Sequence, residues 1–335
     1  MDVARDRNIG ILGTGSYLPA EKVSNDRIAE WTGVTEEWIL RKTGVRHRWY
    51  AAEHEATSDL AAHAARAALA DAGIRPEQVG WILVATCTPD HPMPPTACLV
   101  QDRIGAVNAA AFDVNAVCSG FVIALAAAAE LMDPSAENYA LVIGADIYSR
   151  IIDRTDKRTA VLFGDGAGAV VLGPVPADRG FVGADVRSHG DRHELITVEA
   201  GGSRLPASTG TLADGRHFFR MSGRAVREYV DDEVPAAVRR VLARHGVEPE
   251  RVDHFLPHQA NAVMLQDIRP RLGLPAARLH LTVADHGNTS AGSIPLALDE
   301  ANRGGLLRDG DMLLLAGFGS GMTVATALLR WGGDT

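Results

Sequence analysis

Hydrophobic and polar residues alternate with helical spacing in two long stretches of the chain, residues 58–72 and 225–245. Apolar positions at this spacing predict amphipathic helices that bury one face. A glycine follows each stretch, and glycine readily takes the left-handed conformation that ends a helix. A turn containing proline and a short apolar run, 81–85 or 255–256, come next in both places. We expect each of these runs to form a strand.

Longer apolar runs occur at 140–143 and 313–316, and their lack of alternation is typical of central strands buried on both faces. An alanine-rich stretch, 120–131, predicts a further helix after a strand-like run at 109–114. Glycine-rich segments at 164–168 and 317–321 each lead into another apolar strand. Both parts of the chain therefore follow the same order of elements.

An internal repeat explains this similarity. An offset of 173 residues carries Leu69-Ala70-x-x-Gly73 onto Leu242-Ala243-x-x-Gly246, and it also carries 139–144 onto 312–317. The same offset relates Asn115 to Asn288. A single offset near half the chain length indicates a duplicated unit. Chance alignment of ordinary helix and turn signals is the alternative.

Alternating strands and helices predict an α/β fold with mostly parallel sheets. Two such units suggest helices held between two sheets, with a pseudo-two-fold axis relating the halves. Pro174, Pro176 and Gly180 cluster at the join, so we divide the chain into residues 1–176 and 177–335. Residues 187–217 are polar and rich in glycine, and we expect an inserted surface loop region there.

Composition excludes several classes of function. The 335 residues carry a net charge of -9 and only 5% aromatic residues, which disfavours nucleic-acid binding. The chain has neither an apolar run of membrane-spanning length nor a signal-peptide pattern. Three cysteines, Cys87, Cys98 and Cys118, cannot all pair, which predicts a reducing, cytoplasmic location.

Cys118 is the first candidate for chemistry. It follows the strand-like run at 109–114 and opens the alanine-rich helix, where unpaired N–H groups and the helix dipole favour a thiolate. Gly120 permits close approach of a ligand. The alternative is a small buried residue with no reactivity, which is our interpretation of Cys87 and Cys98.

His258 and Asn288 are the other two candidates. His258 lies just beyond the second-half strand at 255–256, and ligands of α/β sheets bind at that end of a strand. Asn288 precedes Thr289 and is the repeat equivalent of Asn115, although it could simply be a helix cap. A pseudo-two-fold would bring equivalent helix starts together, so Cys118, His258 and Asn288 would line one cleft suited to acyl transfer.

Other motifs are weak. The segment 10–15 resembles a dinucleotide-binding loop, but Pro19 follows it and no helix pattern begins there. Neither the HExxH nor the CxxC spacing occurs, so we expect no metal site.

Taken together, these residues resemble a known family, the β-ketoacyl-acyl-carrier-protein synthases III, which are thiolase-fold condensing enzymes. The resemblance spans nearly the whole chain. Its landmarks are the segments 13–19, 37–39, 41–44, 111–114, 163–168, 257–261 and 286–291. The resemblance implies a duplicated thiolase-like fold with five layers, α-β-α-β-α, and pseudo-two-fold symmetry.

The resemblance also implies an acyltransferase with a catalytic triad at Cys118, His258 and Asn288. Acyl-coenzyme A would load the cysteine, and a malonyl thioester would then lose carbon dioxide and attack the acyl-enzyme. The backbone N–H of Cys118 and one near Ser320 would bind the acyl oxyanion. Coenzyme A thioesters would be substrates, with no separate cofactor, in fatty acid or polyketide biosynthesis.

Further residues are implied for substrate binding. Trp38 matches the family residue that stacks on the adenine of coenzyme A, Lys157 and Arg158 match the facing loop, and Asn261 also falls in that site. In some members a bulky aromatic residue floors the acyl pocket of the partner subunit in a homodimer, and here that position is Met93. The starter acyl group and its length stay open.

Two positions depart from the family pattern. Val263 and Glu228 stand where the family has basic residues that contact an acidic carrier protein. Docking of that partner needs positive charge, so the substitutions leave the carrier of the extender open. The alternative function is a specialised-metabolism relative that transfers the acyl group to a small-molecule nucleophile or condenses coenzyme A thioesters without a carrier protein.

Overall fold

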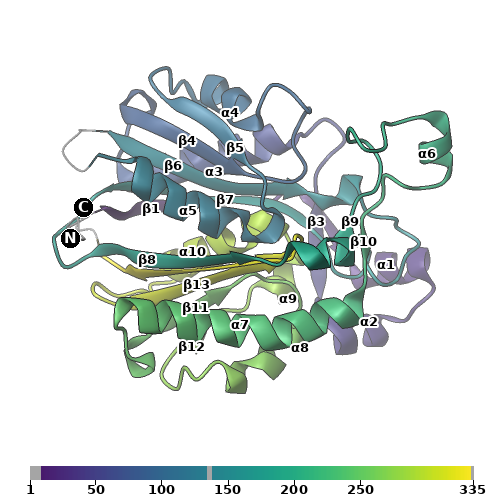
Figure 1. Cartoon of the computed structure of the whole chain (residues 1–335). Coiled ribbons are helices and arrows are strands. Elements are labelled where there is room, and N and C mark those ends of the chain that lie inside the picture. Colours follow the sequence, from purple (N-terminus) through teal and green to yellow (C-terminus); the bar gives the residue numbers. More distant parts are fainter. Residues whose placement is uncertain (1–8, 134–137, 333–335) are drawn as a thin grey trace.

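The computed structural model describes residues 9–133 and 138–332, and two five-stranded sheets form its centre (Figure 1). The first sheet has the order β1-β7-β6-β4-β5 and the second has the order β12-β11-β13-β14-β8. The strands of the first sheet are β1 Ile9–Tyr17, β4 Val79–Ala85, β5 Ala110–Val114, β6 Tyr139–Ile147 and β7 Asp165–Pro174. Those of the second are β8 Gly180–Ser188, β11 His254–Pro257, β12 Arg278–Leu279, β13 Met312–Gly319 and β14 Thr323–Arg330.

The two sheets have the same topology. Read from its other edge, the second sheet has the order β8-β14-β13-β11-β12. Each of these strands is equivalent to the strand at the same place in the first sheet, β1-β7-β6-β4-β5. The offset of 173 residues carries the first residue of β6, Tyr139, onto the first residue of β13, Met312. Gly73 and Gly246 end equivalent helices, both in the left-handed conformation. The predicted duplication is therefore confirmed, while the division at residue 176 stays a prediction.

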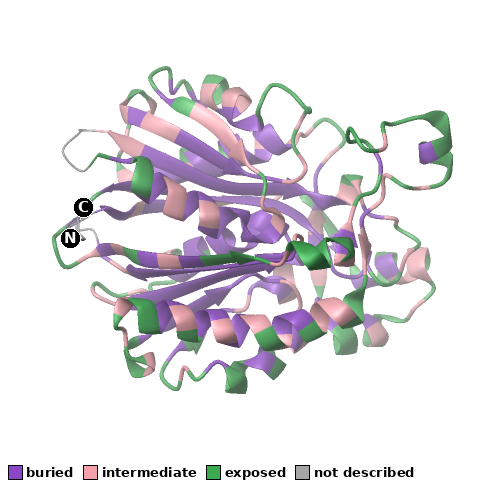
Figure 2. Cartoon of the chain, viewed as in Figure 1, coloured by how far each residue is buried: buried purple, intermediate pink, exposed green. Residues whose placement is uncertain are grey.

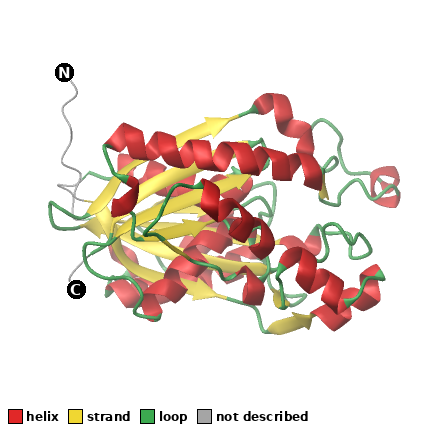
Figure 3. Ribbon diagram, turned by 90° about the horizontal axis from the view of Figure 1, so that it is seen from below, coloured by secondary structure: helices red, strands yellow, loops and turns green. Residues whose placement is uncertain are grey.

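Helices make the other three layers. Helices α5 (Gly120–Leu131) and α10 (Ser293–Arg303) each contact strands of both sheets and so lie between them. Helix α3 (Thr57–Ala72) and α4 (Thr96–Ile104) cover the outer face of the first sheet. Helix α7 (Gly223–His245) covers the second sheet, with α8 (Ala262–Ile268) beside it; Figure 3 shows helices in front of the strands on this side. This is the expected five-layered, thiolase-like α/β fold.

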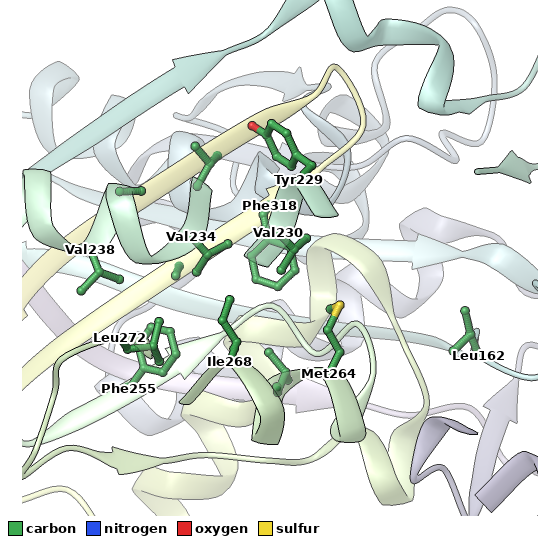
Figure 4. Packing of buried hydrophobic residues seen from close by; sticks show 14 of the residues in the cluster. Leu162, Tyr229, Val230, Val234, Val238, Phe255, Met264, Ile268, Leu272 and Phe318 are labelled. Carbon is green, nitrogen blue, oxygen red and sulfur yellow. The ribbon is translucent and has the colours of Figure 1, made fainter. Parts of the chain in front are cut away.

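Burial explains why these helices differ in sequence. Helix α5 is apolar almost all round because both of its sides face a sheet. Helix α7 alternates buried and exposed positions along its length, as Figure 2 shows. Its buried side chains Tyr229, Val230 and Val234 belong to the same hydrophobic cluster as Phe255 of β11 and Ile268 of α8 (Figure 4). Each fully buried side chain of this size contributes about 1.5–3 kcal/mol.

Three expectations need correction or refinement. The sheets are mixed rather than mostly parallel, because β7 and β14 run antiparallel to both of their neighbours. A short turn joins β13 to β14, and it is too short to hold the crossover helix that a parallel pair would need. The glycine-rich segments lie largely inside β7 and β13 rather than before a strand. The region 187–217 includes the end of β8, a 3-10 turn, the strand β9 (Ile196–Thr197) and the helix α6 (Thr209–Ala213).

The remaining elements build the edge of the molecule that carries the loops. They are β2 Glu21–Ser24, α1 Asn25–Thr32, α2 Glu36–Thr43, β3 His47–Tyr50, β10 Arg220–Met221 and α9 Val283–His286. Within residues 9–133 and 138–332 we find no helix with the length and apolar character that crossing a membrane requires.

Candidate active site

Cys118 sits in a one-turn 3-10 helix, Val117–Ser119, between the end of β5 and the start of α5. Val117 has a φ of 49°, which is unfavourable for a β-branched side chain. Such a conformation persists only where the surrounding structure holds it, and it is common at functional sites. The sharp turn presents the thiol at the N-terminal end of α5, as the sequence predicts.

The second half repeats this turn. Ser290–Gly292 forms the equivalent 3-10 turn before α10, and Ser290 has a φ of 50°. Among the described residues, Val117 and Ser290 are the two non-glycine residues with a left-handed φ, and the 173-residue offset relates them. The two helix starts face each other, because the Ser290 hydroxyl oxygen lies 3.5 Å from the Cys118 sulfur.

Paired glycines let the helix starts approach the sheets. A Cβ atom on Gly317 of β13 would lie 2.8 Å from the Cα of Ser119, and one on Gly144 of β6 would lie 2.1 Å from the carbonyl oxygen of Ala291. Gly144 and Gly317 are themselves related by the repeat offset, and so are Ala291 and Cys118, whose carbonyl oxygens lie near the two glycines. Any larger side chain would push the turns away from the centre of the molecule.

His258 follows β11 directly and is anchored on both sides. Its backbone N–H donates to the carbonyl of Ala316 in β13 at 2.7 Å. Its ring Nδ1 lies 2.8 Å from the hydroxyl oxygen of Ser293, the first residue of α10. Burial lowers the pKa of His258 to about 3, against the opposing effect of a hydrogen bond to the backbone of Ser290. The imidazole is therefore neutral at physiological pH.

Asn288 is held by its backbone and by its side-chain oxygen. The backbone N–H donates to the carbonyl of Leu162 at 2.9 Å, and the backbone carbonyl accepts from the N–H of Gly164 at 3.0 Å. The side-chain oxygen accepts from the N–H of Ser290 at 2.9 Å, which is a local turn interaction. With the oxygen occupied, the amide group presents its N–H donors to the cavity that Asn288 lines.

Cys118, His258 and Asn288 line one cavity of about 50 Å³, so the structure brings the three predicted residues together. The rest of the lining is mainly apolar. It consists of Val117, Phe163, Ile196, Phe219, Met221, Val226, Val230, Ala260, Met264, Phe318, Gly319, Ser320 and Met322. A cavity of this size and character suits a short acyl group beside a thiol.

The expectation of a thiolate in the resting protein is wrong. Burial raises the pKa of Cys118 to about 12, although the hydrogen bond with Ser290 acts to lower it. The thiol is only 7% exposed, so desolvation of the charged form outweighs the helix N-terminus. Cys118 therefore loses its proton as it attacks rather than beforehand.

Other predicted site residues lie elsewhere or have structural contacts. Trp38 on α2 is half-buried, and Lys157 and Arg158 are exposed, with Arg158 paired to Asp156 at 2.9 Å. Asn261 caps α8 by accepting from the N–H of Met264, and it donates to the backbone carbonyl of Lys42. These four residues lie outside the cavity lining, and their contact with coenzyme A stays a prediction.

The last two predicted site residues, Ser320 and Met93, differ in whether they line the cavity. Ser320 lines the cavity, and its hydroxyl donates to the carbonyl of Ile196 at 2.9 Å. Met93 is 81% exposed and lies outside the cavity lining of its own subunit. Within the described part of the chain, no group of three His, Cys, Asp or Glu side chains is arranged to hold a metal ion.

Sequence reasoning missed Ser290, Ser293 and Cys87. Hydroxyl residues near a helix start are ordinary caps, so the serines gave no distinct signal. The repeat offset could have found Ser290, because it is the equivalent of Val117 beside the nucleophile. Cys87 lies 4.0 Å from the Ser290 hydroxyl oxygen and 3.3 Å from the Tyr148 hydroxyl oxygen, which places it behind the same turn.

Comparison with known proteins agrees with this geometry. Residues 112–190 match the family model described as 3-oxoacyl-[acyl-carrier-protein] synthase III, and residues 242–331 match the model of its C-terminal part. An acetoacetyl CoA synthase, NphT7, from Streptomyces sp. strain CL190 is 51% identical over 97% of this chain and 99% of its own length. The chain belongs to the 3-oxoacyl-[acyl-carrier-protein] synthase III family. It is thus an acyltransferase and a condensing enzyme.

Other known proteins are similar to this chain over nearly their full length. A β-ketoacyl-[acyl-carrier-protein] synthase III from Rhodospirillum centenum is 46% identical over 96% of this chain and 98% of its own. The crystal structure of the Pseudomonas aeruginosa synthase III superposes with a TM-score of 0.89 at 39% identity, covering 98% of this chain and all of that one. The priming β-ketosynthase of the R1128 polyketide pathway gives a TM-score of 0.90 at 32% identity, covering 100% and 99% of the two chains.

Proposed function

We propose that Cys118, His258 and Asn288 carry out a decarboxylative Claisen condensation. The observation that carries the proposal is that a thiol and two neutral hydrogen-bonding side chains line one small apolar cavity. The Cys118 sulfur attacks the carbonyl of acyl-coenzyme A, the C–S bond to coenzyme A breaks, and the thiol proton leaves with the coenzyme A sulfur. An acyl-enzyme thioester remains on Cys118.

The first step places negative charge on the Cys118 sulfur as it attacks. With a pKa of about 12, only about one molecule in 10⁵ carries a thiolate near pH 7, so the proton leaves during the attack. The Ser290 hydroxyl, 3.5 Å from the sulfur, is placed to donate to the developing negative charge. The turn at the start of α5 adds backbone N–H groups, and the Cys118 N–H with one near Ser320 would bind the acyl oxyanion.

The second step needs donors rather than bases. When the malonyl thioester loses carbon dioxide, negative charge moves to its thioester oxygen, and N–H groups stabilise that charge. The amide of Asn288 is a donor because its oxygen is occupied by Ser290, and His258 is neutral. The enolate carbon then attacks the acyl carbonyl, and collapse of the tetrahedral intermediate expels the Cys118 sulfur as a thiolate, which takes up a proton from solvent. Each such donor typically contributes a factor of about 10²–10³ in rate.

The extender is malonyl-coenzyme A rather than a malonyl carrier protein. Val263 on α8 is half-buried and uncharged, and Glu228 on α7 is exposed and paired with Arg224 at 3.1 Å. Neither Val263 nor Glu228 itself offers an acidic carrier protein a positive charge, and the Arg224 guanidinium beside Glu228 is already paired with that carboxylate. The 51% identity to a protein named acetoacetyl CoA synthase supports the same assignment. Trp38, Lys157, Arg158 and Asn261 would hold the coenzyme A.

Two assays test these proposals. Intact mass spectrometry after incubation with acetyl-coenzyme A should show an acetyl adduct in the native protein and none in Cys118→Ala; an adduct on the variant would contradict the role of Cys118. Product analysis should then show a 3-oxoacyl-coenzyme A from malonyl-coenzyme A. Reaction with the carrier-bound extender alone would refute the extender assignment, and acyl transfer to an added small-molecule nucleophile without loss of carbon dioxide would favour the alternative function.

Two further features support a homodimer and a cytoplasmic location. Met93 is a large apolar side chain that is 81% exposed in a single subunit, which suits a contact in a homodimer, where it would floor the acyl pocket of the partner. All three cysteines are free, which suits a reducing compartment such as the cytoplasm. Sedimentation of the native protein and of Met93→Asp tests the homodimer, because a monomeric native protein would exclude it.

A further inference from the structure

Ser293 contacts the imidazole of His258 but does not line the cavity. It is buried, it begins α10, and its hydroxyl oxygen lies 2.8 Å from Nδ1 of His258. The same oxygen accepts a hydrogen bond from the backbone N–H of Gln259 at 3.2 Å. The hydroxyl is therefore held between the backbone beside His258 and one nitrogen of its ring.

We propose that Ser293 is a positioning residue that sets the tautomer of His258, by donating its hydroxyl proton to Nδ1 so that Nε2 carries the ring proton. This inference rests on the proposed function, because it assigns His258 the role of a donor to the substrate. Ser293 itself touches no reacting atom.

The chemistry of a hydroxyl favours this tautomer. A carboxylate behind a histidine only accepts, so it keeps the proton on Nδ1 and leaves the opposite nitrogen as a base. A serine hydroxyl has a proton to give. The N–H of Gln259 already donates to the Ser293 oxygen, and a hydroxyl that accepts one hydrogen bond becomes a stronger donor in the next.

The neutral state of His258 makes the choice of tautomer decisive. Burial lowers the pKa of the ring to about 3, so the ring holds one proton rather than two. If that proton were on Nδ1, the other nitrogen would present a lone pair to the oxygen of the enolate and would repel it. With the proton on Nε2, His258 and the amide of Asn288 both donate.

The test separates the two half-reactions in the full chain. In Ser293→Ala, we expect acetyl loading of Cys118 within about threefold of the native rate and release of carbon dioxide from malonyl-coenzyme A at least about tenfold slower. Ser293→Thr, which keeps the hydroxyl, should recover most of the second rate. Ser119→Ala is the matched control, because it removes a buried hydroxyl that donates to the carbonyl of Thr323 instead of to a histidine. In this control both rates should change by the same factor.

The ring nitrogens give a direct readout. In protein labelled with ¹⁵N-histidine, with the His258 signals identified from their loss in His258→Ala, native His258 should show a protonated Nε2 and a bare Nδ1. A bare Nε2 in the native protein, or Ser293→Ala with an unchanged tautomer and unchanged half-reactions, would overturn the inference. If His258→Ala itself released carbon dioxide at the native rate, the proposed role of His258 would fail instead.

Discussion

The buried, neutral His258 predicts a specific loss of stability in mild acid. In the folded protein the pKa of this ring is lowered to about 3 by burial, whereas an unfolded histidine titrates near 6.5. Below the unfolded value, the unfolded chain binds a proton that the folded protein does not. The folded state therefore loses stability as the pH falls from about 6.5 towards about 3.

The magnitude follows from the two pKa values. Between about pH 7.5 and about pH 5.5, the unfolded ring gains about 0.8 of a proton and the folded ring gains almost none. One pH unit below the unfolded pKa corresponds to about 1.4 kcal/mol, so His258 alone should lower the free energy of unfolding by about that amount. The desolvation that carries this effect is also what keeps the imidazole neutral for catalysis.

A matched variant isolates this contribution. His258→Gln removes the titrating group and keeps a polar side chain, while the other histidines, including His280 with its own lowered pKa, stay the same in both proteins. Urea unfolding at equal subunit concentration should show that the stability difference between native protein and variant shifts by about 1.4 kcal/mol over this pH range. Parallel pH profiles for the two proteins would refute the assignment of a neutral, buried His258.

Three further outcomes are expected. Ser290→Ala should slow acetyl loading of Cys118 about 10- to 150-fold near neutral pH, because a hydrogen bond to a charged sulfur contributes about 1.5–3 kcal/mol. Stopped-flow mass analysis measures that rate, and an unchanged rate would exclude the role of Ser290. Asn288→Asp, which replaces a donor by an acceptor, should reduce release of carbon dioxide by about 10²–10³-fold in a radiometric assay, and a smaller loss than in Asn288→Ala would contradict the donor role. Gly317→Ala should lower the free energy of unfolding by about 1–3 kcal/mol, because its Cβ would lie 2.8 Å from the Cα of Ser119. Equal urea midpoints for the native protein and the variant would show that the turn at Ser119 moves aside without a loss of stability.

The sequence determined the elements and their repetition. Periodicity and glycine signals located α3, α5 and α7 within two residues of their ends, because amphipathic spacing and left-handed caps are local properties. The offset of 173 residues and the position of Cys118 before an alanine-rich helix were also readable, since neither depends on distant contacts. From these alone the meeting of Cys118 with Asn288 could be expected, given a pseudo-two-fold axis.

Tertiary structure decided the chemistry of the site. The direction of β7 and β14 relative to their neighbours is decided by which strands pair in the folded protein, which apolar patterning does not encode. The pKa of Cys118 and that of His258 are set by desolvation from elements of both halves, and burial proved stronger than the helix N-terminus that the sequence suggested. In the sequence, Ser290 and Ser293 look like ordinary helix-start residues. The fold places the Ser290 hydroxyl against the Cys118 thiol and the Ser293 hydroxyl against the His258 imidazole, and the role of a hydroxyl depends on such a partner.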